Sequence, residues 1–515
     1  MKHRILGLIL AAGMLMGSLS ACGGTTTQSP APSDGSTPSS GADHGNEITV
    51  GIAQDLDNSL DPYRMTAAGT REVMFNVYEG LVKPDSDGNY VCAVASDFTV
   101  SEDGLVYTFT LRDGVVFHNG EACTIDDVIY SIETCAATSD TAAVASALSA
   151  AQISKTGENQ VVLTLEIPNP DFISYVSRAY IVPANYAEQG NDPVGTGPFK
   201  YVSRSVQENF VLAKHEAYYG EGAKLDKVTY KIYEDNNAMF TALDNGVLDL
   251  VAHLTADQIS TLANGYDVLE GTMNLVQAIY LNHAVKPFDD VRVRQALCYA
   301  VDVQAMLDLT ADGHGTKLGS SMYPAFGKYF DEKLADAYPH DVEKAKALLT
   351  EAGYPDGFSF SIAVPSNYGP HVNSTTVLVE QLKAAGIDAK IDLVDWNTWK
   401  DDIYGGRNFE ATVCGFDAGT LNASALLARF VTGDGKNFIN HSNPDYDATY
   451  AKAQSTFDDA EQTALYKRCL EILSETAANV YTQDLADFVA VRPDLKGYEF
   501  YPMYVMDMST LYYET

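Results

Sequence analysis

The sequence predicts an α/β protein built from more than one domain, and three observations support this class. About 470 residues follow an N-terminal low-complexity stretch, too many for one ordinary hydrophobic core. Residues 358–393 have the pattern of a strand, a helix and a second strand, whereas residues 105–120 resemble a series of hairpins. The chain therefore combines a parallel α/β layer with a separate β-rich region.

Residues 1–22 have the features of a secretory signal peptide. Lys2 and Arg4 precede an apolar run that ends in Leu19-Ser-Ala-Cys22, which resembles a bacterial lipobox. The alternative, a retained membrane helix, is disfavoured because such a helix needs about 20 apolar residues. We expect residues 1–21 to be cleaved and Cys22 to carry a lipid anchor. Residues 22–46, rich in Gly, Ser, Thr, Pro and Ala, are expected to form a flexible tether.

The first half of the folded chain is predicted to be rich in strands. Residues 48–52 and 105–111 alternate apolar and polar side chains with the period of a strand. Thr124 is expected to cap a helix whose first turn holds two acidic residues. Residues 85–89 resemble the start of a calcium loop, but the later ligands are missing, which favours a hairpin turn.

The second half contains clearer α/β signals. A helix is predicted over 342–352, strands over 358–364 and 387–393, and a helix between them over roughly 375–385. A strand, a helix and a strand at this spacing form a βαβ unit with a right-handed crossover. A further helix is expected to begin at Asp289 or Asp290.

Composition restricts the partners of the protein. The formal net charge of -36 repels phosphate backbones, so we expect no binding to nucleic acid. The acidic excess is explained by solubility, with recognition of a cationic ligand as the alternative. Six cysteines besides Cys22 lack metal-ligand spacing, and their pairing cannot be deduced from the sequence. They are Cys92, Cys123, Cys135, Cys298, Cys414 and Cys469.

Several segments together resemble one protein family. They are Asn76-Val-Tyr-Glu-Gly-Leu-Val82, the stretch Ser101 to Gly120, Val194-Gly-Thr-Gly-Pro-Phe199, Pro287-Phe-Asp-Asp-Val-Arg-Val-Arg-Gln-Ala-Leu297 and Glu343-Lys-Ala-Lys-Ala-Leu-Leu-Thr-Glu-Ala-Gly353. In this order they are similar to the solute-binding protein family 5, the extracytoplasmic receptors of oligopeptide, dipeptide and nickel ABC importers.

The resemblance implies a type II periplasmic-binding-protein-like fold, the large three-domain form, with two α/β lobes joined by a hinge. The first lobe would comprise 47–78, 192–281 and 485–515, the second lobe 282–484, and the inserted β-rich domain 79–191. A ligand would bind in the cleft between the lobes. Closure of the lobes would be a hinge motion that the ligand favours by contacting both of them.

Catalytic signatures are mostly absent from the chain. It has no G-x-S-x-G, Walker A or H-E-x-x-H motif, and Gly195-Thr-Gly197 lacks dinucleotide spacing and is interpreted as a turn beside the hinge. We therefore expect neither an enzyme nor a cofactor, and an exported hydrolase is the disfavoured alternative. The histidines are scattered, so we expect no metal site, although a nickel chelate held by one histidine such as His371 stays open.

The resemblance also suggests ligand contacts in the second lobe. Dipeptide-binding members hold the ligand ammonium with an aspartate, and Asn422 occupies the matching position here without a charge. Asp417 is near enough to substitute, or it faces solvent. The segment Pro365 to His371 corresponds to the carboxylate-binding region and contains no arginine, which disfavours a dipeptide specialist.

Aromatic side chains supply further candidates. Trp396 and Trp399 follow a predicted parallel strand, where α/β sheets place ligands, although both could instead belong to the core. Tyr323, Tyr368 and Phe416 are weaker candidates. Thr66 and Gly69, in the loop Thr66 to Thr70, are expected to offer backbone groups to an extended ligand.

The sequence thus predicts a lipid-anchored receptor outside the cytoplasm that captures a solute and delivers it to an ABC permease. An oligopeptide is the expected solute, and a sugar, an opine-like compound or a nickel chelate are the alternatives. We expect the receptor to be a monomer.

Overall fold

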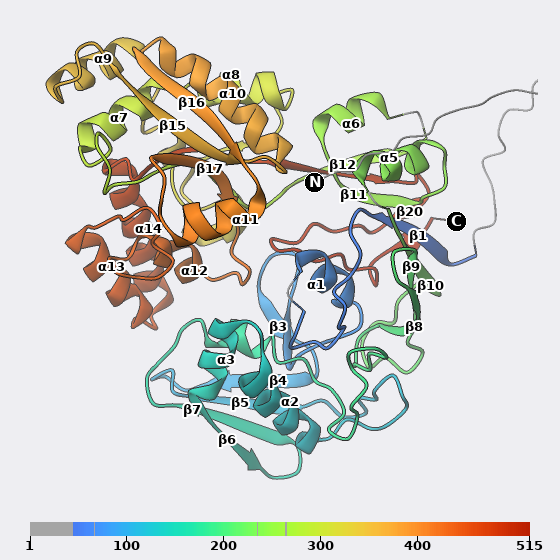
Figure 1. The fold of residues 1–515 in the computed structure, drawn as a ribbon. Helices are drawn as coiled ribbons and strands as arrows, with labels where there is room; N and C mark the ends of the chain where they lie inside the picture. Colours follow the sequence, from blue (N-terminus) through green and yellow to red (C-terminus); the bar gives the residue numbers. More distant parts are fainter. Residues whose placement is uncertain (1–44, 66, 234, 263–264, 515) are drawn as a thin grey trace, which may run out of the picture. The chain divides into compact units, whose positions relative to one another are not determined.

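A computed structural model describes residues 45–65, 67–233, 235–262 and 265–514 of the chain. It contains two large mixed sheets and one four-stranded antiparallel sheet, with helices beside each of them (Figure 1). The predicted α/β class and the predicted β-rich region are both present.

The first large sheet has seven strands and forms the core of the first lobe. Its strands, in order across the sheet, are β12 (Asp267–Thr272), β19 (Ala486–Val491), β11 (Leu250–Leu254), β1 (Glu47–Ile52), β10 (Lys227–Ile232), β9 (Asn209–Lys214) and β8 (Phe199–Ser205). The predicted strand at 48–52 is confirmed as β1, which pairs in parallel with β10 and β11. The helices of this part are α1 (Ala68–Met74), α5 (Asn236–Asp244) and α6 (Ala256–Thr261).

The β-rich region forms a separate antiparallel sheet. Its strands, in order, are β4 (Ala95–Val100), β5 (Val106–Leu111), β7 (Gln160–Leu165) and β6 (Ala151–Thr156). Its helices are α2 (Ile125–Thr138), α3 (Ala142–Ser149) and α4 (Phe172–Val176). Tyr107, Phe109 and Leu111 are buried on one face of β5, as their alternation predicts. Thr124 caps α2 in a reciprocal capping box with Asp127, as expected.

The turn at residues 85–89 is a hairpin turn, as predicted. It connects β2 (Val82–Pro84) to β3 (Tyr90–Cys92), and the backbone N–H of Asp85 donates to the carbonyl of Asn89 at 2.9 Å. The Asp85 carboxylate accepts hydrogen bonds from the backbone N–H groups of Asp87 and Asn89. These acidic and amide side chains therefore build the turn.

The second large sheet has six strands and forms the core of the second lobe. In order they are β14 (Thr316–Lys317), β18 (Asn479–Asp484), β13 (Val276–Leu281), β17 (Ala411–Phe416), β15 (Phe358–Pro365) and β16 (Ile387–Val394). The α-helices are α7 (Val291–Ala300), α8 (Val303–Thr310), α9 (Val342–Glu351), α10 (Gly369–Lys383), α11 (Trp396–Thr398), α12 (Ala423–Leu427), α13 (Pro444–Gln454) and α14 (Asp459–Glu475). Short helical turns are η1 (Pro324–Tyr329), η2 (Glu332–Asp336), η3 (Trp399–Gly405) and η4 (Ala428–Phe430).

This sheet is covered on both faces. Along β13, Val276 and Tyr280 belong to a hydrophobic cluster with α12, α13 and α14, whereas Ile279 and Leu281 belong to a cluster with α7, α8 and α10. Figure 1 shows α9 and α10 near β15 and β16, and α12 to α14 beyond β17. A strand buried on both faces has no polar alternation, which explains why residues 276–281 form a continuous apolar and amide run.

The predicted βαβ unit is confirmed, with one correction. Strands β15 and β16 pair in parallel on either side of α10. The helix begins at Gly369, earlier than the predicted start near Thr375, with Pro370 in its first turn. Proline is tolerated there because the first N–H groups of a helix have no intrahelical partner.

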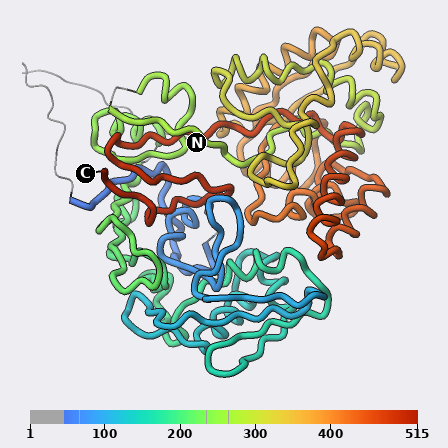
Figure 2. The backbone as a smooth tube through the Cα atoms, turned by 180° about the vertical axis from the view of Figure 1, so that it is seen from behind, coloured from blue at the N-terminus to red at the C-terminus, as the bar shows by residue number. Residues whose placement is uncertain are grey.

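The chain crosses twice between the two large sheets. It passes from β12 to β13 through residues 273–275 and returns from β18 to β19 at Leu485. The sequence analysis assigned residues 276–281 to the first lobe, but their hydrogen-bond partners are β17 and β18 of the second. Figure 2 shows the C-terminal segment, in red, beside the blue start of the folded chain. There Asn76 bonds to the backbone of Met506 and Met508.

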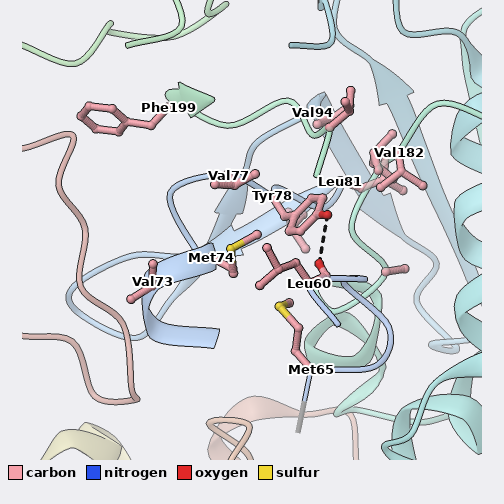
Figure 3. Packing of buried hydrophobic residues seen from close by; sticks show 14 of the residues in the cluster. Leu60, Met65, Val73, Met74, Val77, Tyr78, Leu81, Val94, Val182 and Phe199 are labelled. Atoms are coloured by element: carbon pink, nitrogen blue, oxygen red, sulfur yellow. Dashed lines mark hydrogen bonds between the residues drawn. The ribbon is translucent and has the colours of Figure 1, made fainter. Parts of the chain in front are cut away.

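The core around α1 fixes the first lobe against the inserted region (Figure 3). Val73, Met74, Val77 and Tyr78 are buried, and the hydroxyl of Tyr78 donates to the carbonyl of Leu60 at 3.1 Å. This burial holds one face of α1 in place and leaves the other face for polar side chains.

Gly195 and Gly197 lie against the backbone of Asn76 and Val77, which follow α1. A Cβ atom at either position would collide with the backbone carbonyls of Asn76 or Val77. This close approach of two backbones explains why the Gly-Thr-Gly turn contains glycine.

All six cysteines of the described residues are free thiols. Cys135, Cys298, Cys414 and Cys469 are buried among apolar side chains. The pairing that the sequence left undecided is therefore absent from the described part of the chain.

Candidate functional site

A cavity lies where the two lobes and the inserted region meet. Its internal volume in this structure is about 40 Å³, and it opens to solvent. Its lining comes from four segments that are far apart in the sequence. They are Arg71, Phe75, Tyr78, Glu79, Gly80, Lys83, Pro84 and Tyr90; Ser177, Arg178 and Tyr180; Asp417, Ala418, Gly419 and Thr420; and Met503, Tyr504 and Val505. We call residues 71–90 and 177–180 the first wall and residues 417–420 the second wall.

Two arginines dominate the first wall. Arg71 extends from α1, and Arg178 follows α4, where its Nη1 lies 3.5 Å from the carbonyl oxygen of Gly419 on the second wall. Burial lowers the pKa of Arg71, and the nearby guanidinium of Arg178 lowers it further, whereas Asp417 raises it. The two guanidinium groups are therefore electrostatic neighbours within the cavity.

A buried carboxylate organises the rest of the first wall. Glu79 accepts hydrogen bonds from Lys83 Nζ at 2.7 Å, Tyr218 OH at 2.8 Å and Tyr219 OH at 2.6 Å. Burial alone lowers the pKa of Lys83, but Glu79 outweighs this effect and raises it well above its ordinary value. Glu79 and Lys83 therefore form a charged pair whose charges offset each other.

The second wall is a short loop after β17 that aromatic side chains support. The backbone N–H of Ala418 donates to the hydroxyl of Tyr323 at 3.3 Å. The ring of Phe416 lies 3.8 Å from the guanidinium carbon of Arg429, in cation–π contact. Asp417, between these two anchored residues, is exposed and lines the cavity.

Among the predicted site residues, Asp417 lines the cavity. Tyr368 lies close enough to Asp417 for the charge of the carboxylate to affect its pKa. Burial raises the pKa of Tyr368, and the charge of Asp417 raises it further. The Tyr368 ring lies 5.5 Å from that of His371 and 5.4 Å from that of Trp396, measured between centroids. Tyr368 therefore belongs to an aromatic group beside the second wall.

The two tryptophans stack on each other outside the cavity lining. Their ring centroids are 5.1 Å apart, and Trp396 is 42% exposed whereas Trp399 is 4% exposed. The indole N–H of Trp399 donates to Thr412 Oγ1 at 3.0 Å, which fixes it in the core. Trp396 alone presents a ring face to solvent.

Other predicted site residues are engaged within the protein. Tyr323 is fully buried, and Phe416 packs in the aromatic cluster. His371 is buried, accepts a hydrogen bond from Gln277 Nε2 at 2.7 Å, and has its pKa lowered to about 4 by burial. It is therefore a neutral side chain held against β13, an interior strand of the second lobe's sheet.

The amide of Asn422 makes a contact between the second lobe and the inserted region. Its Nδ2 donates to Ser174 Oγ at 2.6 Å, and the neighbouring Ser424 hydroxyl donates to Asp171. Asn422 is buried by this contact. Gly69 is exposed at the start of α1 outside the cavity lining, and Thr66 and Cys22 lie outside the described residues.

The sequence analysis did not select Arg71, Lys83, Arg178 or Tyr504 for the site. Arg71 directly follows the loop Thr66 to Thr70, which was expected to contact the ligand, so the same reasoning could have selected it. No local sequence pattern indicated that Arg178 or Tyr504 belongs to a binding site. They reach the cavity only because the inserted region and the C-terminal segment fold against α1.

Two general searches of the described residues gave no further site. Every helix there is too short or too polar to span a bilayer. No group of three or more His, Cys, Asp or Glu side chains in this part of the chain is arranged to hold a metal ion.

Comparison with known proteins identifies the class. A cavity lined by both lobes lies where a two-lobed binding protein holds its solute. Residues 89–438 match the family described as "Bacterial extracellular solute-binding proteins, family 5 Middle". The chain therefore belongs to this family, which confirms the resemblance of its motifs. The family consists of solute-binding proteins that work outside the cytoplasm and are not enzymes.

Individual relatives agree with this assignment. The glutathione-binding protein GsiB of Salmonella paratyphi A is 29% identical over 463 residues, covering 83% of this chain and 86% of GsiB. The ABC transporter substrate-binding protein CtaP of Listeria monocytogenes has the same fold, with a TM-score of 0.82 at 23% identity, over 91% of this chain and 99% of CtaP.

A third relative is AgaA from A. tumefacien R10, whose structure contains agropinic acid. Its TM-score is 0.73 at 26% identity, over 91% of this chain and 99% of AgaA. The likeness to these structures confirms the predicted two-lobed type II fold.

Proposed function

We propose that this protein is the substrate-binding component of an ABC importer and that it captures a short peptide in the cavity between its lobes. The observation that carries this proposal is the placement of opposite charges on the two walls: arginines on the first and Asp417 on the second. A peptide with free ends has an ammonium group for Asp417 and a carboxylate for a cation. The likeness to a glutathione-binding protein supports a peptide ligand.

The protein would act as a monomer that delivers its ligand to a membrane permease. Ligand contacts to both walls would favour the closed arrangement of the lobes. The contact between Asn422 and Ser174 would then hold the inserted region against the second lobe while the ligand is bound.

The substitution Asp417→Asn tests the peptide proposal. It should weaken binding of free-amine peptides by about 2–5 kcal/mol, because a desolvated ammonium loses its charged partner. N-acetylated peptides should bind the variant and the wild type alike. Calorimetry of both proteins with each form of the same peptide measures this difference. Asp392→Asn, at an exposed carboxylate of β16, is the matched control.

Equal losses for free and acetylated peptides would show that Asp417 does not bind the amine. Failure of every peptide to bind the wild type would favour a non-peptide solute, the second candidate. The 26% identity to AgaA, whose structure contains agropinic acid, supports that candidate. Native mass spectrometry of gently purified protein would identify a co-purified ligand directly.

We also propose that Cys22 carries a lipid that anchors the mature protein to the membrane, an interpretation that rests on the sequence Leu19 to Cys22. Cys22→Ser should release the protein from the membrane fraction and remove the lipid mass. Membrane retention with an unchanged mass would overturn the anchor.

A further inference from the structure

The charge of the cavity is opposite in sign to that of the chain. The formal net charge of the protein is -36, yet the cavity lining holds three cations, Arg71, Lys83 and Arg178, against the carboxylates of Glu79 and Asp417. Lys83 and Glu79 bond to each other at 2.7 Å. Two guanidinium groups therefore face a single further carboxylate.

The two arginines reach this cavity from different parts of the fold. Arg71 lies on α1, whose opposite side is packed into the core of the first lobe, and Arg178 follows α4 of the inserted region. Both side chains are partly buried. The guanidinium of Arg178 lies close enough to lower the pKa of Arg71, so an anion placed between the two groups would be attracted by both charges.

Arginine also has the geometry that a carboxylate requires. Its planar guanidinium presents parallel N–H donors that bind the two oxygens of a carboxylate together, and it stays charged at any physiological pH. The segment Pro365 to His371, where the family resemblance implied an arginine, contains none. In this chain the cationic groups of the cavity lie on the opposite wall.

We propose, resting on the proposed function above, that Arg71 and Arg178 bind carboxylate groups of the ligand and make this receptor selective for net-anionic solutes. The ligand would be a short peptide or peptide-like compound with more carboxylates than ammonium groups. Its amino end would lie at Asp417 and its carboxylates at the first wall.

Calorimetry with matched probes tests this selectivity. The probes are glutathione and its glycine ethyl ester, with Ala-Glu and Ala-Gln as a second pair that differs in one carboxylate. The proteins are the wild type, Arg71→Gln, Arg178→Gln and Arg71→Lys. Arg468→Gln is the matched control, because Arg468 is an exposed arginine of α14 that pairs only with surface glutamates. Thermal unfolding of each variant checks that it is folded.

Each of Arg71→Gln and Arg178→Gln should weaken binding of the acid probe by roughly 10- to 100-fold, the loss expected for a hydrogen bond to a charged group. The neutralised member of each pair should bind the wild type more weakly and respond less to the substitutions. Arg71→Lys should recover part of the affinity, and Arg468→Gln should change nothing.

The proposal fails if both members of each pair bind the wild type equally, if the variants weaken both equally, or if neither acid probe binds. Binding of neutral free-amine peptides that depends on Asp417 but not on Arg71 or Arg178 would remove this inference and leave the proposed function standing. Failure of every peptide, whatever its charge, would remove both.

Discussion

Arg71 and Arg178 on the first wall stand opposite Asp417 on the second, and the two walls support these charges with different kinds of contacts. On the first wall, the polar side of α1 is held by ionic and hydrogen-bonded groups. Glu72, next to Arg71, bonds to His253 Nε2 at 2.9 Å, and His253 Nδ1 lies 3.1 Å from Asp487 of β19. On the second wall, the loop is held by aromatic packing around Tyr323 and Phe416.

This difference has a physical consequence for each wall. Ionic contacts between titratable groups depend on protonation, so the first wall should respond to pH. Aromatic packing depends on shape and buried area, so the second wall should respond to truncation and be insensitive to pH. Substitutions that act on one wall at a time separate the two kinds of support.

The largest effect is expected from Tyr323→Ala on the second wall. Removing a fully buried aromatic ring should lower the free energy of unfolding by about 3–5 kcal/mol. Tyr323→Phe keeps the ring and loses only the hydrogen bond to Ala418, which should lower it by about 0.5–1.5 kcal/mol. Denaturant unfolding of the ligand-free proteins measures both values, and similar losses for the two variants would show that packing is not the main support.

Glu79→Gln tests the ionic support of the first wall. The substitution removes the charged partner of Lys83 and should lower the free energy of unfolding by about 1.5–3 kcal/mol. The double variant Glu79→Gln/Lys83→Met should recover stability relative to the single one, because no unpaired charge is left. Thermal and denaturant unfolding compare the set, and a double variant less stable than the single one contradicts this account.

Trp396→Ala tests whether the exposed ring beside the second wall contacts the ligand. It should weaken ligand binding by about 1–3 kcal/mol and leave the ligand-free melting temperature nearly unchanged, because this side chain is 42% exposed. Trp399→Ala, at the buried partner ring, should instead lower stability. Unchanged affinity in Trp396→Ala would remove this residue from the site.

The smallest effect is expected from His253 and concerns pH. Burial lowers the pKa of His253, but Glu72 and Asp487 outweigh it and raise the pKa well above its ordinary value. The protonated histidine therefore stabilises the fold fully below the unfolded-state pKa of about 6.5, and this contribution is lost as the pH rises through the folded-state pKa.

The difference in melting temperature between wild type and His253→Gln should thus be larger near pH 6 than at strongly alkaline pH. Titration of the histidine ring by NMR measures the folded-state pKa directly. Tyr323→Phe serves as the control, since its difference from wild type should not change over the same range. A His253→Gln difference that grows with pH would contradict the assignment.

Local patterns in the sequence predicted many of the helices, strands and turns. The alternation in residues 105–111 and 358–364, the capping box at Thr124 and the turn at residues 85–89 all predicted elements that the structure contains. The start of α10 was missed because Pro370 is ambiguous: proline suits both a loop and the first turn of a helix.

The candidate site was predictable only in part. Asp417 was selected because it lies close in sequence to the position at which the family places an aspartate, and it does line the cavity. Asn422 was selected because it occupies the family's aspartate position, and His371 as a histidine that could hold a nickel chelate, but they bond to Ser174 and Gln277. Whether a polar side chain faces a ligand or a protein partner depends on neighbours that are distant in the chain.

The sequence by itself determined the family, through the resemblance of its motifs, and the α/β class, because periodicity, caps and turn residues act over a few neighbouring positions. Only the tertiary structure decided which sheet residues 276–281 join, because a fully buried apolar run suits either sheet. It also decided the charge of the cavity. Arg71, Arg178 and Asp417 meet there through contacts between three separate regions, and no local pattern encodes such long-range packing.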